Sequence, residues 1–322
     1  MFCVFVRPVP RVYIGGMVLR DYASAQVVPA PTMRRRKVRS KCRIMKPRTT
    51  TEPIAKCALR SLAVTCLVLC SAALPARAHD TWLQPRRVAV LPGTIAQLDL
   101  TSGDKFATQE TVIKQERIES ARVRLNGRTV DIKDRAPEKK SLELRAPLSE
   151  PGVATLWISL APKGVDLRPK EVRHYLAEID APASLRQPWE SAKGGKPWRE
   201  VYTKHAKTFV RVGRPKSDRS WSQPVGMALE IVPEKDPTAL QTGDEFPVRV
   251  LKNGSPLAEF SLGIVHEGGT NRAFKKTDAA GRTVFKLTRS GRWLLRGTEL
   301  RAAAKPAGGW ESDSTSLMFE VR

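Results

Sequence analysis

Short alternating segments separated by turn residues fill the sequence from residue 79 onward, and they constrain the fold more than any other feature. In segments such as "RVAVLPGTIAQLDLTSGD" and "EPGVATLWISLAP", apolar and polar residues alternate beside Pro and Gly. Asn126-Gly127 is a strong hairpin signal, because both residues accept the positive φ of a type I′ turn. A second series begins at Val225, without βα alternation in either series. We therefore predict an all-β fold of two β-sandwich domains, Ig-like or transthyretin-like.

The segment between the two series is rich in Pro, Gly and Lys, and it is the natural place for a domain boundary. Within it, the apolar residues of 199–210 recur at a spacing that predicts an amphipathic helix, although its tail "KTFVRVG" would also fit a strand. We predict an N-terminal sandwich at 79–212, a linker at 213–224 and a C-terminal sandwich at 225–322.

Residues 56–78, "KCALRSLAVTCLVLCSAALPARA", have the layout of a secretory signal peptide, with a basic flank, an apolar run and a final Ala-Arg-Ala. We predict a signal peptide at 45–78, cleaved after Ala78, and a periplasmic or secreted product. Residues 1–44 would be an untranslated or disordered extension before a start at Met45. Two alternatives stay open. A lipoprotein would be cut before Cys70, where Leu69 replaces the usual small residue, and an uncleaved anchor would need a longer apolar run.

The formal net charge of +24 suggests a nucleic-acid or membrane-surface partner. However, the first 78 residues hold 15 of the basic residues and 2 of the acidic ones, which leaves 41 basic against 30 acidic residues in the remainder. We therefore expect no nucleic-acid partner and a chain that is not embedded in a membrane. All five cysteines also precede His79, so the remainder has no disulfide, thiolate nucleophile or cysteine-based zinc site.

The sequence lacks HExxH, GxSxG and a glycine-rich phosphate loop, and we predict that the protein is not an enzyme. Cleavage after Ala78 would place a free α-amine beside the Nδ1 atom of His79, and these two nitrogens could chelate nickel, cobalt or copper. Asp80 would add a carboxylate. The alternative is a solvated N-terminal histidine without metal.

The other three histidines are weighed in the same way. His205 lies on the apolar side of the predicted helix, which favours a half-buried histidine over a ligand. His174, in "EVRHYLAEI", would face inward from a strand. For His266, at the end of a strand, exposed and ligand roles are both open. The candidate metal ligands are His79, Asp80, His205 and His266.

Seven tryptophans are scattered through the same region. Trp157 and Trp293 lie in apolar strands and are predicted core residues. Trp189, Trp198 and Trp221 could line a ligand groove or cap the sandwiches.

Several segments together resemble a bacterial exported family of unknown function that is often linked to nickel uptake (NikM-like). They are "AHDTWLQP", "REVYTKHAKTFVRVG", "VGMALEIVPEKDPTALQTGDEFPVRVLKNGSPLAEFSLGIV", "TDAAGRTVFKLTRSGRWLLRGTEL" and "WESDSTSLMFEV". The resemblance implies a periplasmic protein that handles a transition metal, with a metal-uptake membrane transporter or a TonB-dependent receptor as partner.

The resemblance also implies a C-terminal sandwich of the transthyretin or carboxypeptidase-regulatory type. In its "TDAAGRTVF" hairpin, Asp278 would cap the turn and Gly281 would take the left-handed position. Related sequences often carry a histidine after "GRWLLR", where this chain has Glu299 as the remaining candidate ligand.

Two other functions stay open. A structural or interaction module would contact an outer-membrane receptor or a polysaccharide without metal. A metal-dependent oxidase would need a second histidine opposite His79.

Overall fold

The computed structural model describes residues 79–322, except 192–196, 216–217, 270–272 and 305–308. The signal peptide predicted at 45–78 and the extension at 1–44 lie outside the described residues. In the described part of the chain, every helix falls short of the length and apolar character that a bilayer crossing needs.

The described strands form three sheets, and the first is a five-stranded sheet of order β1-β3-β8-β7, with β4 beside β3. Its strands are β1 (Asp80–Pro85), β3 (Thr94–Gly103), β4 (Thr111–Val112), β7 (Asp134–Pro137) and β8 (Leu142–Leu148). The four-stranded sheet has the order β12-β13-β14, with β17 beside β13. Its strands are β12 (Leu229–Pro233), β13 (Glu245–Lys252), β14 (Ser255–Pro256) and β17 (Arg282–Lys286).

The ten-stranded sheet lies between these two and has the order β16-β15-β18-β19-β11-β9-β5-β6, with β10 and β2 both paired to β11. Its strands are β2 (Ala89–Val90), β5 (Ile118–Leu125), β6 (Arg128–Asp131), β9 (Gly152–Leu160), β10 (Lys163–Leu167), β11 (Trp198–Val212), β15 (Ser261–His266), β16 (Ala273–Lys276), β18 (Gly291–Ala302) and β19 (Trp310–Val321). The short helices are α2 (Pro169–Glu178), α3 (Ala183–Ser191), η1 (Gln115–Arg117) and η2 (Ser220–Ser222).

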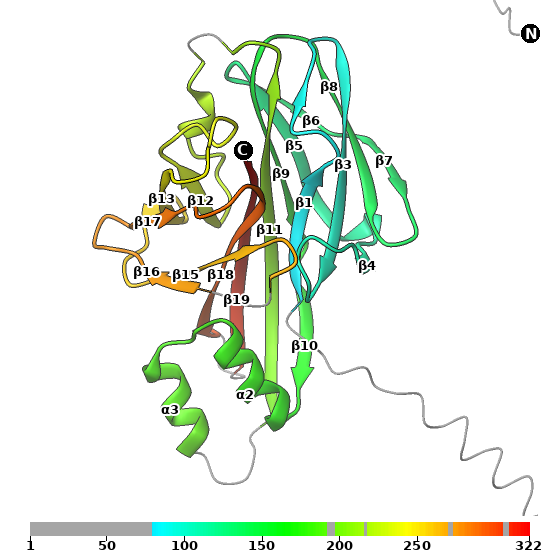
Figure 1. Cartoon of the computed structure of the whole chain (residues 1–322). Coiled ribbons are helices and arrows are strands. Elements are labelled where there is room, and N and C mark those ends of the chain that lie inside the picture. Colours follow the sequence, from blue (N-terminus) through cyan, green and yellow to red (C-terminus); the bar gives the residue numbers. More distant parts are fainter. Residues whose placement is uncertain (1–78, 192–196, 216–217, 270–272, 305–308) are drawn as a thin grey trace, which may run out of the picture. The chain divides into compact units, whose positions relative to one another are not determined.

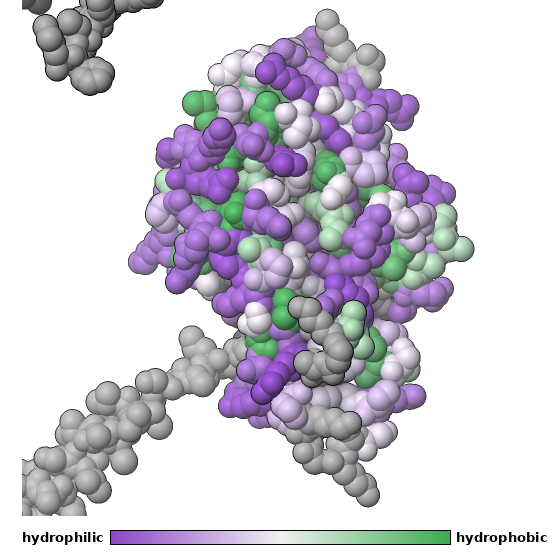
Figure 2. Space-filling view, turned by 180° about the vertical axis from the view of Figure 1, so that it is seen from behind, coloured by the Kyte–Doolittle hydropathy of each residue, from purple (hydrophilic) through white to green (hydrophobic). Residues whose placement is uncertain are grey.

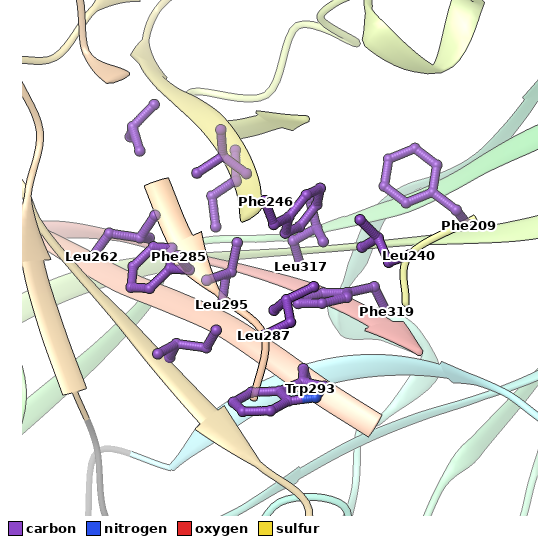
Figure 3. Packing of buried hydrophobic residues seen from close by; sticks show 14 of the residues in the cluster. Phe209, Leu240, Phe246, Leu262, Phe285, Leu287, Trp293, Leu295, Leu317 and Phe319 are labelled. Atoms are coloured by element: carbon purple, nitrogen blue, oxygen red, sulfur yellow. The ribbon is translucent and has the colours of Figure 1, made fainter. Parts of the chain in front are cut away.

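The ten-stranded sheet buries both of its faces, one against each smaller sheet (Figure 1). Neighbouring residues of β11 show this directly. Phe209 packs with Phe246 and Val248 of the four-stranded sheet, whereas Val210 packs with residues of the five-stranded sheet. Successive side chains of a strand point to opposite faces. Figure 3 shows the first of these cores, with side chains from the ten-stranded and four-stranded sheets interdigitated.

This arrangement confirms the predicted all-β fold of packed β-sheets. The residues before and after the predicted linker at 213–224 share the ten-stranded sheet, because β11 pairs in parallel with β19. The described residues also belong to one compact unit. The division into separate domains at 79–212 and 225–322 stays a prediction.

The helix predicted at 199–210 is wrong, because these residues form the long strand β11. Val201, Tyr202, Thr203, Thr208, Phe209 and Val210 are β-branched or aromatic residues of the kind that favour strands. Four neighbours hold the strand, since β9 and β10 pair with it in antiparallel fashion and β2 and β19 in parallel. Sheet pairing therefore overrides the helical spacing of its apolar residues.

The strand predicted around His174 is also wrong, because the segment forms helix α2. Pro169 stands at its first turn, and the Glu171 carboxylate accepts a hydrogen bond from the Arg168 backbone N–H at 2.8 Å, as in a capping box. The His174 side chain is 72% exposed rather than facing inward. The buried side of α2 contributes Val172 and Leu176 to an apolar cluster with Trp198.

Both predicted turns form as expected. Asn126 and Gly127 have φ angles of 51° and 75° between the antiparallel strands β5 and β6. The Asp278 carboxylate accepts hydrogen bonds from the backbone N–H groups of Ala280 and Arg282 at 2.9 and 2.8 Å. Gly281 has a φ of 72°, and a Cβ atom there would lie 2.5 Å from the Val250 carbonyl oxygen.

The tryptophans cap or fill the cores. Trp157 and Trp293 are buried, as predicted. Trp198 stacks on Trp310 with ring centres 4.5 Å apart, and Trp189 contacts Trp198 edge-on. Trp221 is buried in the core beside the four-stranded sheet. The face in Figure 2 is mostly hydrophilic, with small apolar patches between polar residues.

Candidate functional site

A cavity of about 250 Å³ opens on the ten-stranded sheet, where β1, β10 and α2 border the strands β11, β18 and β19. We call it the His79 cavity. Many of its lining residues are polar, and Val165, Leu167 and Ile179 add apolar surface. The polar residues include His79 just before β1, Asp80 and Thr81 of β1, Tyr175 near the end of α2, Glu200, Tyr202 and Lys204 of β11, Arg296 and Thr298 of β18, and Ser312, Ser314 and Ser316 of β19.

The register of three strands places the polar floor of this cavity. Lys204 lies opposite Ser314, which in turn lies opposite Thr298, so that all three side chains share one face of the sheet. Two residues along, Tyr202 lies opposite Ser312 in the same face. Small hydroxyl side chains at these positions leave room that larger residues would fill.

His79 lies immediately before β1 and is about one-third exposed. Its Nε2 atom is 3.5 Å from Asp104 Oδ1. Its carbonyl oxygen accepts a hydrogen bond from Lys204 Nζ at 2.5 Å. The antiparallel pairing of β1 with β3, in which Asp80 lies opposite Gly103, brings Asp104 next to His79. The sequence reasoning missed Asp104, although the matching alternation of "HDTWLQP" and "LDLTSGD" is a signal for that pairing.

Asp80 faces a cation. Its Oδ1 atom is 2.6 Å from Arg296 Nε, and Arg296 Nη2 is 3.9 Å from Glu178 Oε1. Arg296 is 4% exposed, and its Nη1 atom is buried without a hydrogen-bond partner among the described residues. The sequence reasoning did not single out Arg296 or Glu178.

His205 borders the same cavity, but its side chain lies on the other face of the sheet. Its Nδ1 atom is 2.8 Å from Ser159 Oγ, and its Nε2 atom is 3.8 Å from Asp313 Oδ1. Burial raises the pKa of Asp313, but contacts with His205, Lys252 and Arg301 outweigh burial and hold that pKa well below its usual range. The structure thus does not bring the imidazoles of His79 and His205 to one centre, which is what the oxidase alternative would need.

The remaining candidates lie elsewhere. His266 Nε2 is 2.8 Å from the Ser290 carbonyl oxygen, and its ring contacts Trp293 edge-on. The Glu299 carboxylate is 3.2 Å from Lys252 Nζ and 2.6 Å from Arg301 Nη1. Within residues 79–322, outside the gaps given above, no three His, Cys, Asp or Glu side chains gather as metal ligands.

Burial changes the acid–base chemistry of the cavity. Burial lowers the pKa of Lys204 to about 8, although the nearby Asp80 carboxylate opposes that shift. Burial also raises the pKa of Tyr175 well above its usual value, and the Glu200 carboxylate adds to this. Tyr175 Oη donates a hydrogen bond to Glu200 Oε1 at 2.9 Å.

The family model described as "Domain of unknown function (DUF4198)" matches residues 76–298. The chain belongs to this DUF4198 family. Among curated proteins, no match was found. The finding supports the resemblance to a family of unknown function, whereas export, the nickel-uptake role and the transthyretin-type C-terminal sandwich stay predictions.

Several solved structures resemble this DUF4198 chain weakly. One is the Bacteroides ovatus mixed-linkage glucan utilization locus SGBP-B in complex with a mixed-linkage heptasaccharide, at 10% identity and a TM-score of 0.18, with 73% of this chain and 43% of that chain covered. Another is native alpha-2-macroglobulin from Escherichia coli, spanning domains MG0-NIE-MG1, at 10% identity and 0.18, with 74% and 97% covered. A third is the Yersinia pseudotuberculosis adhesin InvE, at 12% and 0.19, with 74% and 58% covered. At these scores, the likenesses carry no argument about function.

Proposed function

We propose that this DUF4198 protein is an exported, non-enzymatic binding protein that holds a transition-metal ion, nickel, cobalt or copper, at His79. One observation supports this most directly. The His79 imidazole is partly exposed at the edge of a polar cavity, with the Asp104 carboxylate 3.5 Å from Nε2.

The contacts of His79 fit a metal-binding histidine. Histidine ligands commonly turn their other ring nitrogen toward a carboxylate, which fixes the tautomer and orients the ring. With the Nε2 proton directed at Asp104, Nδ1 is the nitrogen left for a metal. Cleavage after Ala78 would add the α-amine on the same residue, and both nitrogens suit nickel, cobalt and copper. Water or a small ligand would complete the coordination.

The neighbourhood supports His79 as the centre of the proposed site. Lys204 holds the His79 carbonyl oxygen, and β3 holds β1, so the residue has a defined position before metal arrives. Asp80 faces Arg296, and Glu299 faces Lys252 and Arg301. Asp80 is therefore not the carboxylate of the proposed site. Asp104 is, and it orients the His79 imidazole. In this proposal the protein passes metal to an uptake transporter or a TonB-dependent receptor.

Nickel titration of the exported protein tests the proposal. The full-length chain is expressed in a Gram-negative host, and the exported form is weighed by intact-mass spectrometry and titrated with nickel and copper by calorimetry. We expect a mature chain that starts at His79 and binds one metal ion at micromolar or lower concentration, on the order expected for a specific site. His79→Gln should abolish binding, and Asp104→Asn should weaken it about 10- to 100-fold.

His174→Ala is the matched control, because His174 is an exposed histidine outside the cavity. It should bind metal like the unmodified protein. Absence of metal binding, a mature chain with another first residue, or equal losses in His174→Ala and His79→Gln would refute the metal site. The interaction module without metal would then be the leading function.

A further inference from the structure

Two cationic side chains in the His79 cavity have hydrogen-bond donors that the described residues do not use. The Lys204 ammonium has three N–H groups and donates one hydrogen bond, to the His79 carbonyl oxygen. Arg296 is more than nine-tenths buried, and its Nη1 atom has no hydrogen-bond partner in the described part of the chain. A buried charged donor without an acceptor is costly, so such donors commonly mark a place where another group binds.

The acidic groups of the cavity, by contrast, are engaged. Asp80 and Glu178 both face Arg296. The Glu200 carboxylate accepts three hydrogen bonds. Their donors are Tyr175 Oη at 2.9 Å, Trp198 Nε1 at 2.9 Å and Ser312 Oγ at 2.5 Å. The cavity therefore has donors left over while its acceptors are occupied, and a ligand that completes it must bring hydrogen-bond acceptors, of which a carboxylate group carries two.

The rest of the floor suits an organic molecule. Thr298 Oγ1 and Ser314 Oγ lie 2.9 Å apart beside Lys204, and hydroxyl groups can both donate and accept. The cavity volume of about 250 Å³ exceeds the space that a single inorganic ion needs and is near the lower end of small-molecule pockets.

We propose that the His79 cavity binds a small organic molecule that carries a carboxylate group. The carboxylate lies against Lys204 and Arg296, and the body of the molecule lies along Thr298 and Ser314. Its charged contacts come from β11 and β18, whereas the metal is proposed at His79 beside Asp104. Lys204 contacts both sites, because it also donates a hydrogen bond to the His79 carbonyl oxygen.

Calorimetric titration of the exported form of the protein with carboxylates tests this proposal. The protein is first treated with EDTA and dialysed, and is then titrated with acetate, succinate and citrate, with succinamide as the uncharged match to succinate. We expect at least one carboxylate to bind with a Kd below about 10 mM, and succinamide not to bind in that range. Lys204→Met and Arg296→Lys should each weaken binding at least about tenfold, since the first removes the charge and the second the planar guanidinium.

Lys286→Met is the matched control, because Lys286 is an exposed lysine on the four-stranded sheet. It should leave carboxylate affinity unchanged. Thermal unfolding of each variant shows whether it is folded. If a charge variant does not fold, Ser314→Ala is tested instead. It removes one hydroxyl and should weaken carboxylate binding, by less than the charge variants.

The proposal fails if none of the three carboxylates binds, if succinamide binds as well as succinate, or if the cavity variants bind like Lys286→Met. Binding of inorganic phosphate alone would also overturn it. Asp104→Asn separates the two proposals, since it should weaken metal binding and keep carboxylate affinity. If the unmodified protein binds metal but binds none of the carboxylates, this inference is refuted and the metal site remains supported.

Discussion

Lys204 is the residue on which the chemistry of the cavity depends most. It lies between the strands of the floor and the start of β1, and it holds the His79 carbonyl oxygen while facing Asp80. Its ammonium is transferred out of water on folding without a direct carboxylate hydrogen bond, and this explains why its pKa falls to about 8. Lys204 therefore links the position of His79 to the charge of the cavity.

The lowered pKa of Lys204 makes protein stability depend on pH in a defined direction. Because the folded chain releases this proton near pH 8 and the unfolded chain only near 10.5, the unfolded chain binds more protons between these values. The free energy of unfolding that Lys204 contributes should therefore rise with pH across that window. Below about pH 8 both states are protonated, and the burial penalty is fully present.

Urea unfolding of the unmodified protein and Lys204→Met at about pH 7.5 and about pH 9.5 measures this effect. The difference in unfolding free energy between the two proteins should move in favour of the unmodified protein at the higher pH. An unchanged difference would show that Lys204 titrates normally.

Strand β11 is the element that separates two kinds of site. Its alternation sends Lys204 to the face that lines the His79 cavity and His205 to the opposite face, where His205 contacts Ser159 and approaches Asp313. In a helix, the neighbouring residues Lys204 and His205 would not point to opposite faces. The strand thus makes His205 a structural residue beside a cavity to which its side chain does not belong.

His205→Leu should therefore destabilise the protein without changing metal affinity. The substitution leaves the buried Ser159 hydroxyl without its partner, and we expect a loss of about 1–3 kcal/mol in unfolding free energy. Urea unfolding and nickel titration of the same preparation measure both quantities. The exposed His174→Ala variant should stay within about 0.5 kcal/mol. A fall in nickel affinity like that of His79→Gln would contradict this assignment.

At the scale of the whole molecule, the ten-stranded sheet joins the two series of strands seen in the sequence. Leu98, in the five-stranded sheet, packs in the core on one face of the ten-stranded sheet. Leu317, in β19 of the ten-stranded sheet, packs in the core on the other face, beside the four-stranded sheet. Strand β11 belongs to both cores, because it contributes Phe209 to one and Val210 to the other. Loss of either core should loosen strands on which the other core depends.

We expect the folded part of the chain to unfold in one cooperative transition. Leu98→Ala and Leu317→Ala each remove most of a fully buried side chain. Each should lower the free energy of unfolding by about 2–5 kcal/mol. Differential scanning calorimetry and near-UV circular dichroism should give the same midpoint for each variant. Two separate transitions, with each variant lowering a different one, would instead support independent domains at 79–212 and 225–322.

Local patterns predicted much of the fold and only part of the site. Alternation and turn residues identified the strands around Asn126 and Gly281, because those conformations are encoded by neighbours in the sequence. The residues 199–210 and the segment around His174 were misassigned, since pairing with β9 and β19 decides the first and the Pro169 helix start decides the second. His79 was singled out from the cleavage pattern. Asp104, Lys204 and Arg296 were missed because only the register between distant strands brings them together.

The hydrogen bond between Ser316 and the Thr81 carbonyl oxygen, 2.6 Å long, spans 235 positions of the sequence. The central strand β19 likewise joins partners more than a hundred positions apart in β11. Such distant pairings must wait until large loops have closed, and domains rich in them fold slowly. During synthesis, β19 becomes available after every other strand of the sheet. The chain would therefore stay incompletely folded through most of its translation, a state that is compatible with the proposed export.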